Sequence, residues 1–533
     1  MTVRNFFYLS FIALIPLGLW LTHLQVHAIT YWIIFAIYTI IGFYDIFSNH
    51  PVLNNYPVIG TFRYLFEAIR PEIQQYFVAT DLSGRPYNRQ QRTLVYRRAK
   101  NLTDTAPFGT QHDLNEPEYH FTLQSLNPKK FNKNDLRFQI GNHQCQQPYQ
   151  ASILNISAMS YGALSKTAVE ALNMGAKIGN FMHNTGEGGL TDHHLKHSGD
   201  LCLQLGTGYF SMRNPDGTFS PELFKEKTAL PNIKCIEIKL SQGAKPSHGG
   251  VLPKEKISDE IANIRLINND HDCISPFSHS AFTTPLEMMD FITQLRELSG
   301  GKPIGFKLCL GTHHEFMSIC KAMIEKDVYP DFITIDGAEG GTGAAPVEFS
   351  NRLGTPINEA LSFVHNTLVG LNIRQHIKIL AAGKVVSGFG ILMKLALGAD
   401  GVNMARTMMF ALGCIQSLRC NENTCPTGVA TSNPRRYKAL KPGAKGPRVA
   451  NYHHNSLQSF MELAGAMGVQ NMVELTPDLI RHRENGGHSI DYANFANYID
   501  AGAILNGTAP KLYMKPWLAC SANAFSLRKQ NDK

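Results

Sequence analysis

The chain has 533 residues, of which 44% are apolar and 17% are charged, and its formal net charge is +8. This length exceeds one small domain and leaves room for a large α/β domain with additional segments. The mild basic surplus suits anionic cofactors, acidic substrates or a membrane surface. It is too diffuse to indicate nucleic-acid binding, and no nucleic-acid-binding motif accompanies it.

Two apolar stretches begin the chain, Phe6–Leu21 and Ile29–Phe47, and Asp45 is their only charged residue. Each approaches the roughly 20 residues that a helix needs to span a bilayer. We favour a transmembrane helical hairpin, residues 1–50, over a single span or a cleaved signal peptide, because no small-residue cleavage site separates the two stretches. The connector Thr22–Ala28 lacks Lys and Arg, whereas arginines recur from Arg63 onward. The positive-inside rule then predicts an inner (cytoplasmic) membrane protein whose main body faces the cytoplasm.

Residues 51–150 are polar, rich in Pro, Asn and Arg, and only weakly periodic. We interpret them as a connector that wraps the following domain. The stretch Phe62–Phe77 has the spacing of an amphipathic helix, which we expect to lie near the membrane.

Short β-like runs alternate with helical patterns from residue 151 onward, which indicates βα units and a parallel sheet. The eight candidate strands are Ser152–Ser157, Asn180–Asn184, Leu201–Leu205, Ile233–Leu240, Ile304–Leu308, Phe332–Ile335, Ile377–Ala381 and Gly401–Ala405. Eight is the number that closes a (β/α)8 TIM barrel, here residues 151–435. A doubly wound open sheet is the alternative, but no GxGxxG motif follows the first strand. We expect residues 436–533 to form a helical extension.

Glycine-rich or lysine-bearing segments follow five of these strands, at the rim where a barrel builds its active site. They are Ala158–Gly162, Asn184–Gly189, Lys239–Pro246, Asp336–Ala344 and Gly383–Lys384. Glycine lets the backbone approach a ligand and leaves N–H groups free to hold phosphate. The lysines supply the positive charge that stabilises a reduced, anionic flavin. A single glycine-rich turn is weak evidence, but five at strand ends indicate a ligand site.

Cys414, Cys420 and Cys425 lie in a polar loop that ends in Cys-Pro. Three such cysteines are typical of iron–sulfur ligation. Zinc normally takes four ligands, and this stretch has no fourth Cys or His. From the spacing alone, a cluster, a zinc site and three free thiols all stay open. Most of the other cysteines stand alone in apolar stretches, which indicates reduced, packed thiols of a cytosolic protein.

Five motifs together resemble the FMN-binding domain of glutamate synthases. They are SAMSYG, NTGEGG, KLSQGAKPSHGGVLP, DGAEGGTGAAP and GCIQSLRCNENTCPTGVAT, and they lie within residues 150–435. The resemblance implies a (β/α)8 barrel, FMN, and a 3Fe–4S cluster held by Cys414, Cys420 and Cys425.

The resemblance also implies roles for individual residues around the flavin. Those that would line it are Ala158, Met159, Ser160, Thr185, Gly186 and Glu187. Those that would contact the flavin or a substrate imine are Lys239, Gln242 and Lys307, with Lys245 a further candidate for the substrate carboxylates. Those that would cradle the phosphate and ribityl chain are Gly340, Gly341, Thr342, Gly343, Gly383 and Lys384. We single out Lys307, Glu187 and Lys239 as catalytic candidates; Glu187 would transfer a proton or simply order its loop.

The implied activity is that of an oxidoreductase acting on CH–NH2 donors, which reduces the imine of 2-oxoglutarate and ammonia to glutamate. Two apolar stretches stand where glutamate synthases carry a glutaminase domain, and no NAD(P)H-binding domain is evident. Electrons would therefore come from a partner such as ferredoxin or a separate reductase subunit. The segment Ser275–Ser280 keeps one of two adjacent histidines of the family, which leaves open another amine or 2-oxo acid as substrate. A membrane-bound electron-transfer subunit is the other alternative.

Overall fold

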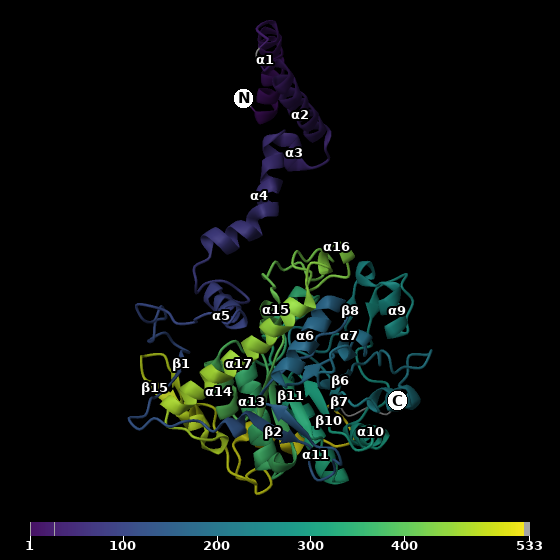
Figure 1. Ribbon diagram of the computed structural model, residues 1–533, viewed down its shortest axis with the longest axis vertical. Coiled ribbons are helices and arrows are strands. Elements are labelled where there is room, and N and C mark those ends of the chain that lie inside the picture. Colours follow the sequence, from purple (N-terminus) through teal and green to yellow (C-terminus); the bar gives the residue numbers. More distant parts are fainter. Residues whose placement is uncertain (1, 26, 527–533) are drawn as a thin grey trace. The chain divides into compact units, whose positions relative to one another are not determined.

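The structure is a computed structural model that describes residues 2–25 and 27–526 (Figure 1). The chain divides into two compact units, residues 1–90 and 91–533, which are described separately below.

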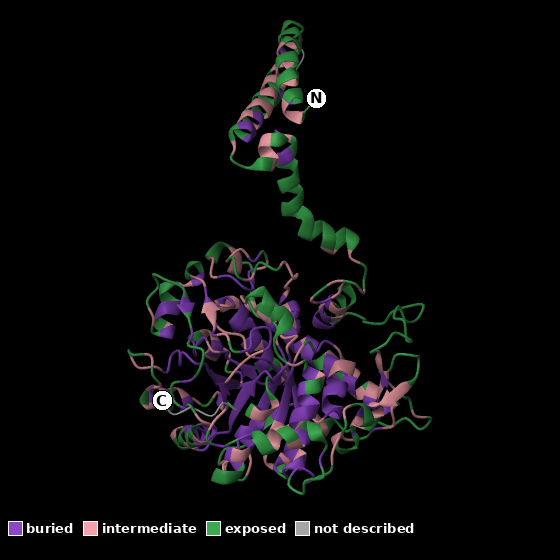
Figure 2. Cartoon of the chain, turned by 180° about the vertical axis from the view of Figure 1, so that it is seen from behind, coloured by how far each residue is buried: buried purple, intermediate pink, exposed green. Residues whose placement is uncertain are grey.

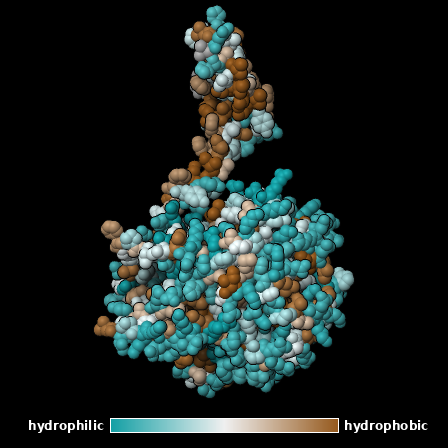
Figure 3. Space-filling model, in the orientation of Figure 1, coloured by the Kyte–Doolittle hydropathy of each residue, from teal (hydrophilic) through white to brown (hydrophobic). Residues whose placement is uncertain are grey.

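The first unit begins with two long apolar helices, α1 (Val3–His23) and α2 (Ala28–Phe47). Both are long and apolar enough to cross a membrane, with a mean hydropathy of 1.6, and little of either is buried. They pack through the ring of Phe7, which lies so close to Gly42 that a Cβ there would be 2.0 Å from it. The predicted hairpin is therefore present, with apolar side chains over its outer surface (Figure 3).

Two further helices complete the first unit, α3 (Pro51–Asn55) and α4 (Ile59–Ile73), and α4 continues into a π-helical turn, Gln74–Val78. The helix predicted over Phe62–Phe77 is thus confirmed. Asp45 is buried at the end of α2, where its Oδ2 accepts hydrogen bonds from the Val58 N–H at 2.8 Å and the Thr61 hydroxyl at 3.0 Å. The one charge in the apolar stretches therefore holds the start of α4.

The second unit is built on a closed barrel of eight parallel strands. They are β4 (Leu154–Ile156), β5 (His183–Asn184), β6 (Leu201–Leu205), β7 (Ile233–Lys239), β10 (Ile304–Leu308), β11 (Phe332–Asp336), β12 (Lys378–Ala382) and β13 (Gly401–Met404). All eight predicted strands are present, and the ring closes where β13 pairs with β4. Figure 2 shows the strands buried inside a shell of helices. The (β/α)8 prediction is confirmed, and the open-sheet alternative is wrong.

The outer helices include α6 (Lys166–Gly179), α8 (Pro221–Thr228), α10 (Pro285–Leu298), α11 (His313–Lys326), α13 (Ile357–Gly370) and α14 (Gly388–Ala396). The helical patterns in the sequence predict helices that agree with α6, α11, α13 and α14 to within one residue at each end; they are Ser165–Ile178, His314–Lys326, Pro356–Leu371 and Gly388–Leu397. Serine side chains cap α6 and α14: Ser165 accepts from the N–H of Ala168, and Ser387 accepts from the N–H of Gly390.

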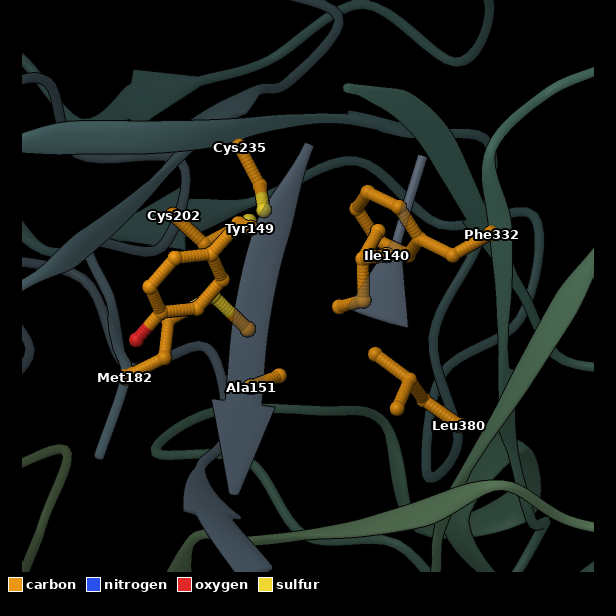
Figure 4. Packing of buried hydrophobic residues seen from close by; sticks show 8 residues of the cluster. All are labelled: Ile140, Tyr149, Ala151, Met182, Cys202, Cys235, Phe332 and Leu380. Atoms are coloured by element: carbon orange, nitrogen blue, oxygen red, sulfur yellow. The ribbon is translucent and has the colours of Figure 1, made fainter. Parts of the chain in front are cut away.

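An antiparallel hairpin closes the end of the barrel at which the strands begin. Its strands are β2 (Arg137–Ile140) and β3 (Tyr149–Ser152). Ile140, Tyr149 and Ala151 pack against residues at the starts of the barrel strands, among them Cys202 and Phe332 (Figure 4). Since this end is filled by side chains, the end at which the strands finish is left for a ligand.

Segments before and after the barrel lie on its outside. The helix α17 (Pro442–Ala466) packs along α6 and α14, and α19 (Lys511–Ala519) packs on α11. The segment 436–533 is not wholly helical, because β14 (Ile480–Arg483) and β15 (Ser489–Asp491) form a small sheet with β1 (His120–Thr122). The excursion between β7 and β10, residues 240–303, holds β8 (Val251–Leu252), α9 (Asp259–Arg265), β9 (Cys273–Ile274) and α10.

Candidate functional site

The five segments singled out in the sequence meet at the rim where the barrel strands end. A Cβ on Gly186 would lie 2.5 Å from the backbone nitrogen of Ser160, so the segments after β4 and β5 touch. A Cβ on Gly243 would lie 1.9 Å from the carbonyl oxygen of Gly337, so the segments after β7 and β11 also touch. Glycine at these two positions permits a backbone contact that any side chain would block.

The predicted flavin-lining residues stand on the first two of these segments. Ala158, Met159 and Ser160 are partly exposed, whereas Thr185 and Gly186 are buried behind them. Gln242 is partly exposed on the segment after β7. The rim thus presents backbone and small side chains to a ligand.

Two ion pairs link the charged residues of the rim. The Lys239 Nζ lies 2.6 Å from Oε1 of Glu187, and the Lys307 Nζ lies 3.0 Å from Oδ2 of Asp336. Burial alone would raise the pKa of Glu187, but Lys239, Lys245 and Arg265 together hold it below its usual value. Burial alone would lower the pKa of Lys307, but Asp336 and Glu237 raise it above its usual value. Glu187 is therefore ionised and Lys307 is protonated at neutral pH.

Lys245 differs from the other two lysines of the rim. It is 3% exposed, and in the described part of the chain its ammonium makes no hydrogen bond or ion pair. Burial lowers the pKa of Lys245 to about 8, against the opposing effect of Glu187. A cation in so buried a position, with no carboxylate within ion-pairing distance, favours an anionic ligand.

A polar network that sequence reasoning missed lies beneath the rim. Glu237 is fully buried inside the barrel, where its carboxylate accepts hydrogen bonds from Asn184 at 2.8 Å, Gln204 at 2.6 Å and Thr334 at 2.6 Å. The only signal in the sequence is a glutamate between two isoleucines, Ile236 and Ile238, in a strand. Its charge acts on Lys307 and helps to keep that lysine protonated.

The segments after the last two strands form the other side of the rim. Gly383 and Lys384 follow β12, and Arg406 begins the helix α15 (Arg406–Leu412) directly after β13. The Arg406 guanidinium donates to the carbonyl of Glu339 at 2.5 Å, and its side chain lies against Gly341. Arg406 thereby connects the glycine-rich segment Gly340–Gly343 to the segment after β13. Barrels often hold phosphate here, yet Arg406 was not among the predicted residues.

The three cysteines lie on one loop between α15 and the short helix α16 (Pro434–Tyr437). They are free thiols, and the charges of Cys420 and Cys425 both act on Cys414. Burial raises the pKa of Cys414 to about 12 and also raises that of Cys420. Burial has the same tendency at Cys425, but hydrogen bonds from the backbone at Ala430, Thr427 and Val429 outweigh it and lower its pKa.

These thiols do not surround a single point. Within residues 2–25 and 27–526, no three His, Cys, Asp or Glu side chains form a group that could hold a metal ion. In an iron–sulfur cluster, by contrast, each thiolate binds a different iron, and hydrogen bonds to the sulfurs tune the cluster. The N–H of Gln416 lies 3.4 Å from the Cys414 sulfur, and backbone N–H groups surround that of Cys425. This donor set fits a cluster.

The conserved region of glutamate synthases matches residues 91–470 of this chain. The chain belongs to the glutamate synthase family. A glutamate synthase large subunit-like protein of Bacillus subtilis, YerD, is 37% identical over 476 residues, which cover 82% of this chain and 90% of YerD. An archaeal glutamate synthase (NADPH) of Methanocaldococcus jannaschii is 33% identical over 372 residues, 69% of this chain and 68% of that protein. Among solved structures, flavocytochrome b2 covers 79% of this chain at 14% identity, with a TM-score of 0.43 and 85% of its own chain covered.

The region that matches glutamate synthases contains the barrel, the cysteine loop, the β2–β3 hairpin and α17. It begins at Gln91, where the second compact unit begins. The α1–α2 hairpin lies outside it.

His279, the histidine of the segment Ser275–Ser280, contacts the end of β7 beneath the rim. It is buried, and its ring nitrogens lie 2.9 Å from the carbonyl oxygen of Lys239 and 3.0 Å from the Tyr209 hydroxyl. Burial lowers the pKa of His279 to about 4. A neutral ring can donate to the carbonyl of Lys239 and accept from Tyr209, so His279 fixes the end of β7.

We predict that His279 makes the folded state acid-sensitive. Its pKa is about 4 when folded and about 6.5 when unfolded, so the unfolded state binds an extra proton between these values. The contribution is complete above pH 6.5 and is lost as the pH falls from 6.5 to 4, by about 3 kcal/mol. In His279→Gln, the apparent free energy of unfolding in urea should fall less steeply over this range. His454→Gln, at an exposed position, is the control; equal pH slopes for both variants would contradict the prediction.

Proposed function

We propose that this member of the glutamate synthase family is an FMN- and iron–sulfur-dependent oxidoreductase that forms glutamate. The overall reaction would be 2-oxoglutarate plus ammonium plus two electrons and two protons, giving glutamate and water. The observation that carries the proposal is the rim, where a buried, unpaired lysine stands among glycine-rich segments at the strand ends. A flavin–imine reaction needs both features together: an anion site and a backbone surface open to a cofactor.

FMN, when bound, would supply hydride chemistry. Residues 158–160 and 185–186 would face its ring system, with Gln242 beside them. Gly340, Gly341, Thr342, Gly343, Gly383 and Lys384 would cradle the phosphate and ribityl chain, and we add Arg406 to this group. The protonated Lys307 would supply positive charge to the reduced ring.

Lys245 is our choice for the contact with a substrate carboxylate, because its ammonium alone among the three rim lysines lacks a partner. Lys239 and Lys307 are each held by a carboxylate and would orient the site. Glu187 is ionised beside Lys239, so it would act as a proton acceptor or an anchor for Lys239 rather than as an acid. Lys307, Glu187 and Lys239 would thus form the charged surroundings of the reaction, and Lys245 would bind the substrate.

A 3Fe–4S cluster on Cys414, Cys420 and Cys425 would supply one-electron transfer. Support comes from the N–H groups directed at the Cys414 and Cys425 sulfurs. The cysteine loop also contacts the segment that precedes the barrel: the Tyr96 hydroxyl donates to the carbonyl of Cys414 at 2.6 Å.

A basic surface beside the cysteine loop supports an acidic redox protein, such as ferredoxin or a reductase subunit, as the electron donor. The segments 91–103 and 423–461 contain no Asp or Glu. Their exposed or partly exposed cations are Arg97, Lys100, Arg435, Arg436, Lys438, Lys441, Lys445 and Arg448. Burial and the charges of Arg448 and Lys100 lower the pKa of Lys445, so these three cations lie close enough to repel one another. An acidic partner would relieve that repulsion.

The α1–α2 hairpin would anchor the enzyme in the inner membrane, with the barrel in the cytoplasm. Support comes from the length of the two helices, their exposed apolar surface and the arginines that follow them.

The redox proposal predicts about one FMN and three irons per chain in the anaerobically purified full-length protein. With reduced methyl viologen, 2-oxoglutarate and ammonium, it should form glutamate. Cys420→Ser should lose iron and keep FMN, whereas Cys145→Ser, outside the loop, should keep both. Turnover of another 2-oxo acid but not of 2-oxoglutarate would show that the proposed substrate is wrong. Reduction of the flavin without formation of any amino acid would favour an electron-transfer subunit. Absence of flavin would overturn the proposal.

The basic surface predicts a charge-dependent donor interaction. Lys438→Glu with Lys441→Glu should raise the KM for reduced ferredoxin about tenfold at low salt and leave kcat nearly unchanged, since rim charges act mainly on association. Turnover with methyl viologen should be unaffected. The matched control reverses two exposed lysines elsewhere, Lys225→Glu with Lys515→Glu. A similar change of KM in the control variant would show that this surface is not the docking site.

Membrane anchoring predicts that the chain stays in the membrane pellet after a carbonate wash, because two spans resist extraction. Trypsin added to inverted inner-membrane vesicles should cleave the barrel unit, while trypsin added to spheroplasts should not. Release of the chain by carbonate would contradict the membrane anchor. Cleavage of the barrel unit in spheroplasts would contradict the predicted orientation.

A further inference from the structure

A buried lysine joins the segment after β4 to the cysteine loop. Lys256 ends a short 3-10 turn, Lys254–Lys256, in the excursion between β7 and β10, and it is 2% exposed. Its Nζ donates to the carbonyl of Ala163 at 3.0 Å and to the carbonyl of Cys420 at 3.2 Å. Ala163 lies three residues beyond Ser160, and Cys420 is the middle cysteine. One ammonium group thus touches both proposed cofactor regions.

The turn that carries Lys256 is fastened on both sides. Toward the cysteine loop, the Asn423 side-chain amide donates to the carbonyl of Glu255 at 2.8 Å. The Asn423 side-chain oxygen in turn accepts from the Thr431 hydroxyl at 2.7 Å. Toward the segment after β4, Arg265 of the same excursion donates to the carbonyl of Tyr161 at 3.0 Å. The excursion therefore acts as a brace between the two segments, and Lys256 is its buried centre.

The charge of Lys256 is unusual in its surroundings. None of the described carboxylates forms an ion pair with it, and the groups of opposite charge that act on it are Cys420 and Cys425. A buried charge paired only by carbonyls costs stability, and an uncharged donor would serve a purely structural brace. A fixed cation beside a cluster favours the form that carries an additional electron, because net charge is one determinant of the cluster's reduction potential.

We propose that Lys256 is a positioning residue that fixes the cysteine loop against the segment after β4 and raises the reduction potential of the cluster through its charge. The effect on potential rests on the proposed function. The effect on loop position does not, because both hydrogen bonds belong to the protein itself.

The test uses three substitutions at Lys256 in the full-length protein. Lys256→Met removes the charge and the donors, Lys256→Gln keeps a donor without the charge, and Lys256→Arg keeps both. Lys254→Met is the matched control, since Lys254 is an exposed cation two residues away. Redox titration followed by electron paramagnetic resonance reports the cluster, and the rate of Cys420 alkylation in chelator-treated, iron-free protein reports the loop.

We expect Lys256→Met and Lys256→Gln to lower the reduced-to-oxidised ratio of the cluster about tenfold at a fixed poise, which corresponds to 59 mV for one electron. Lys256→Arg should restore most of the ratio, and Lys254→Met should leave it unchanged. Cys420 alkylation should become severalfold faster in Lys256→Met and change little in Lys256→Gln. Should Lys256→Met fail to fold, Lys256→Gln still tests the charge.

The inference would be overturned if the Lys256 variants had the same cluster reduction potential and the same Cys420 alkylation rate as Lys254→Met. Protein that holds no iron would defeat the proposed cluster and the effect on its potential, while the alkylation rates would still test the brace. The two failures are therefore distinguishable.

Discussion

Closure of the parallel barrel is the constraint on which the rest of the structure depends. Parallel strands that close on themselves bring all their carboxyl ends to one rim, whatever their separation in the chain. Pairing of β13 with β4 completes the ring, and it brings Arg406 to the same rim as Ser160. The floor hairpin β2–β3 fills the opposite end with apolar side chains. A ligand site is then possible at one end only, and the glycine-rich segments lie there.

Charge is distributed unevenly over this frame. Inside the barrel, the Glu237 carboxylate accepts hydrogen bonds from three neutral side chains, and its negative charge raises the pKa of Lys307. At the rim, Lys239 and Lys307 each have a carboxylate partner, whereas Lys245 has none among the described residues. Outside the barrel, the segments 91–103 and 423–461 carry cations and contain no Asp or Glu. A low-dielectric interior makes each of these arrangements matter more than it would in water, so the same fold supports an anion site on the rim and an attractive surface for an acidic partner.

Several parts of the site followed from sequence because they are local. Short apolar runs that alternate with helical patterns predicted all eight strands, since such a pattern extends over a few residues only. The helix starts at Ser165 and Ser387 obeyed capping rules for the same reason. Pairings across the barrel did not follow. Lys239 and Glu187 are 52 residues apart, and Lys256 and Cys420 are 164 apart, so nothing in either neighbourhood specifies the partner.

The sequence by itself determined the fold class, the family motifs, the apolar hairpin and the three cysteines, because each is written in residue type and short-range spacing. Tertiary structure alone decided that Lys239 and Lys307 pair with carboxylates while Lys245 does not, that Glu187 is ionised, and that Arg406 and Lys256 contact the predicted segments. It also showed that the cysteine thiols do not converge on a single-ion site among the described residues. The reason is physical: pKa values, ion pairs and buried donors depend on distances and solvent exclusion, and these are fixed only when the barrel closes and distant segments meet.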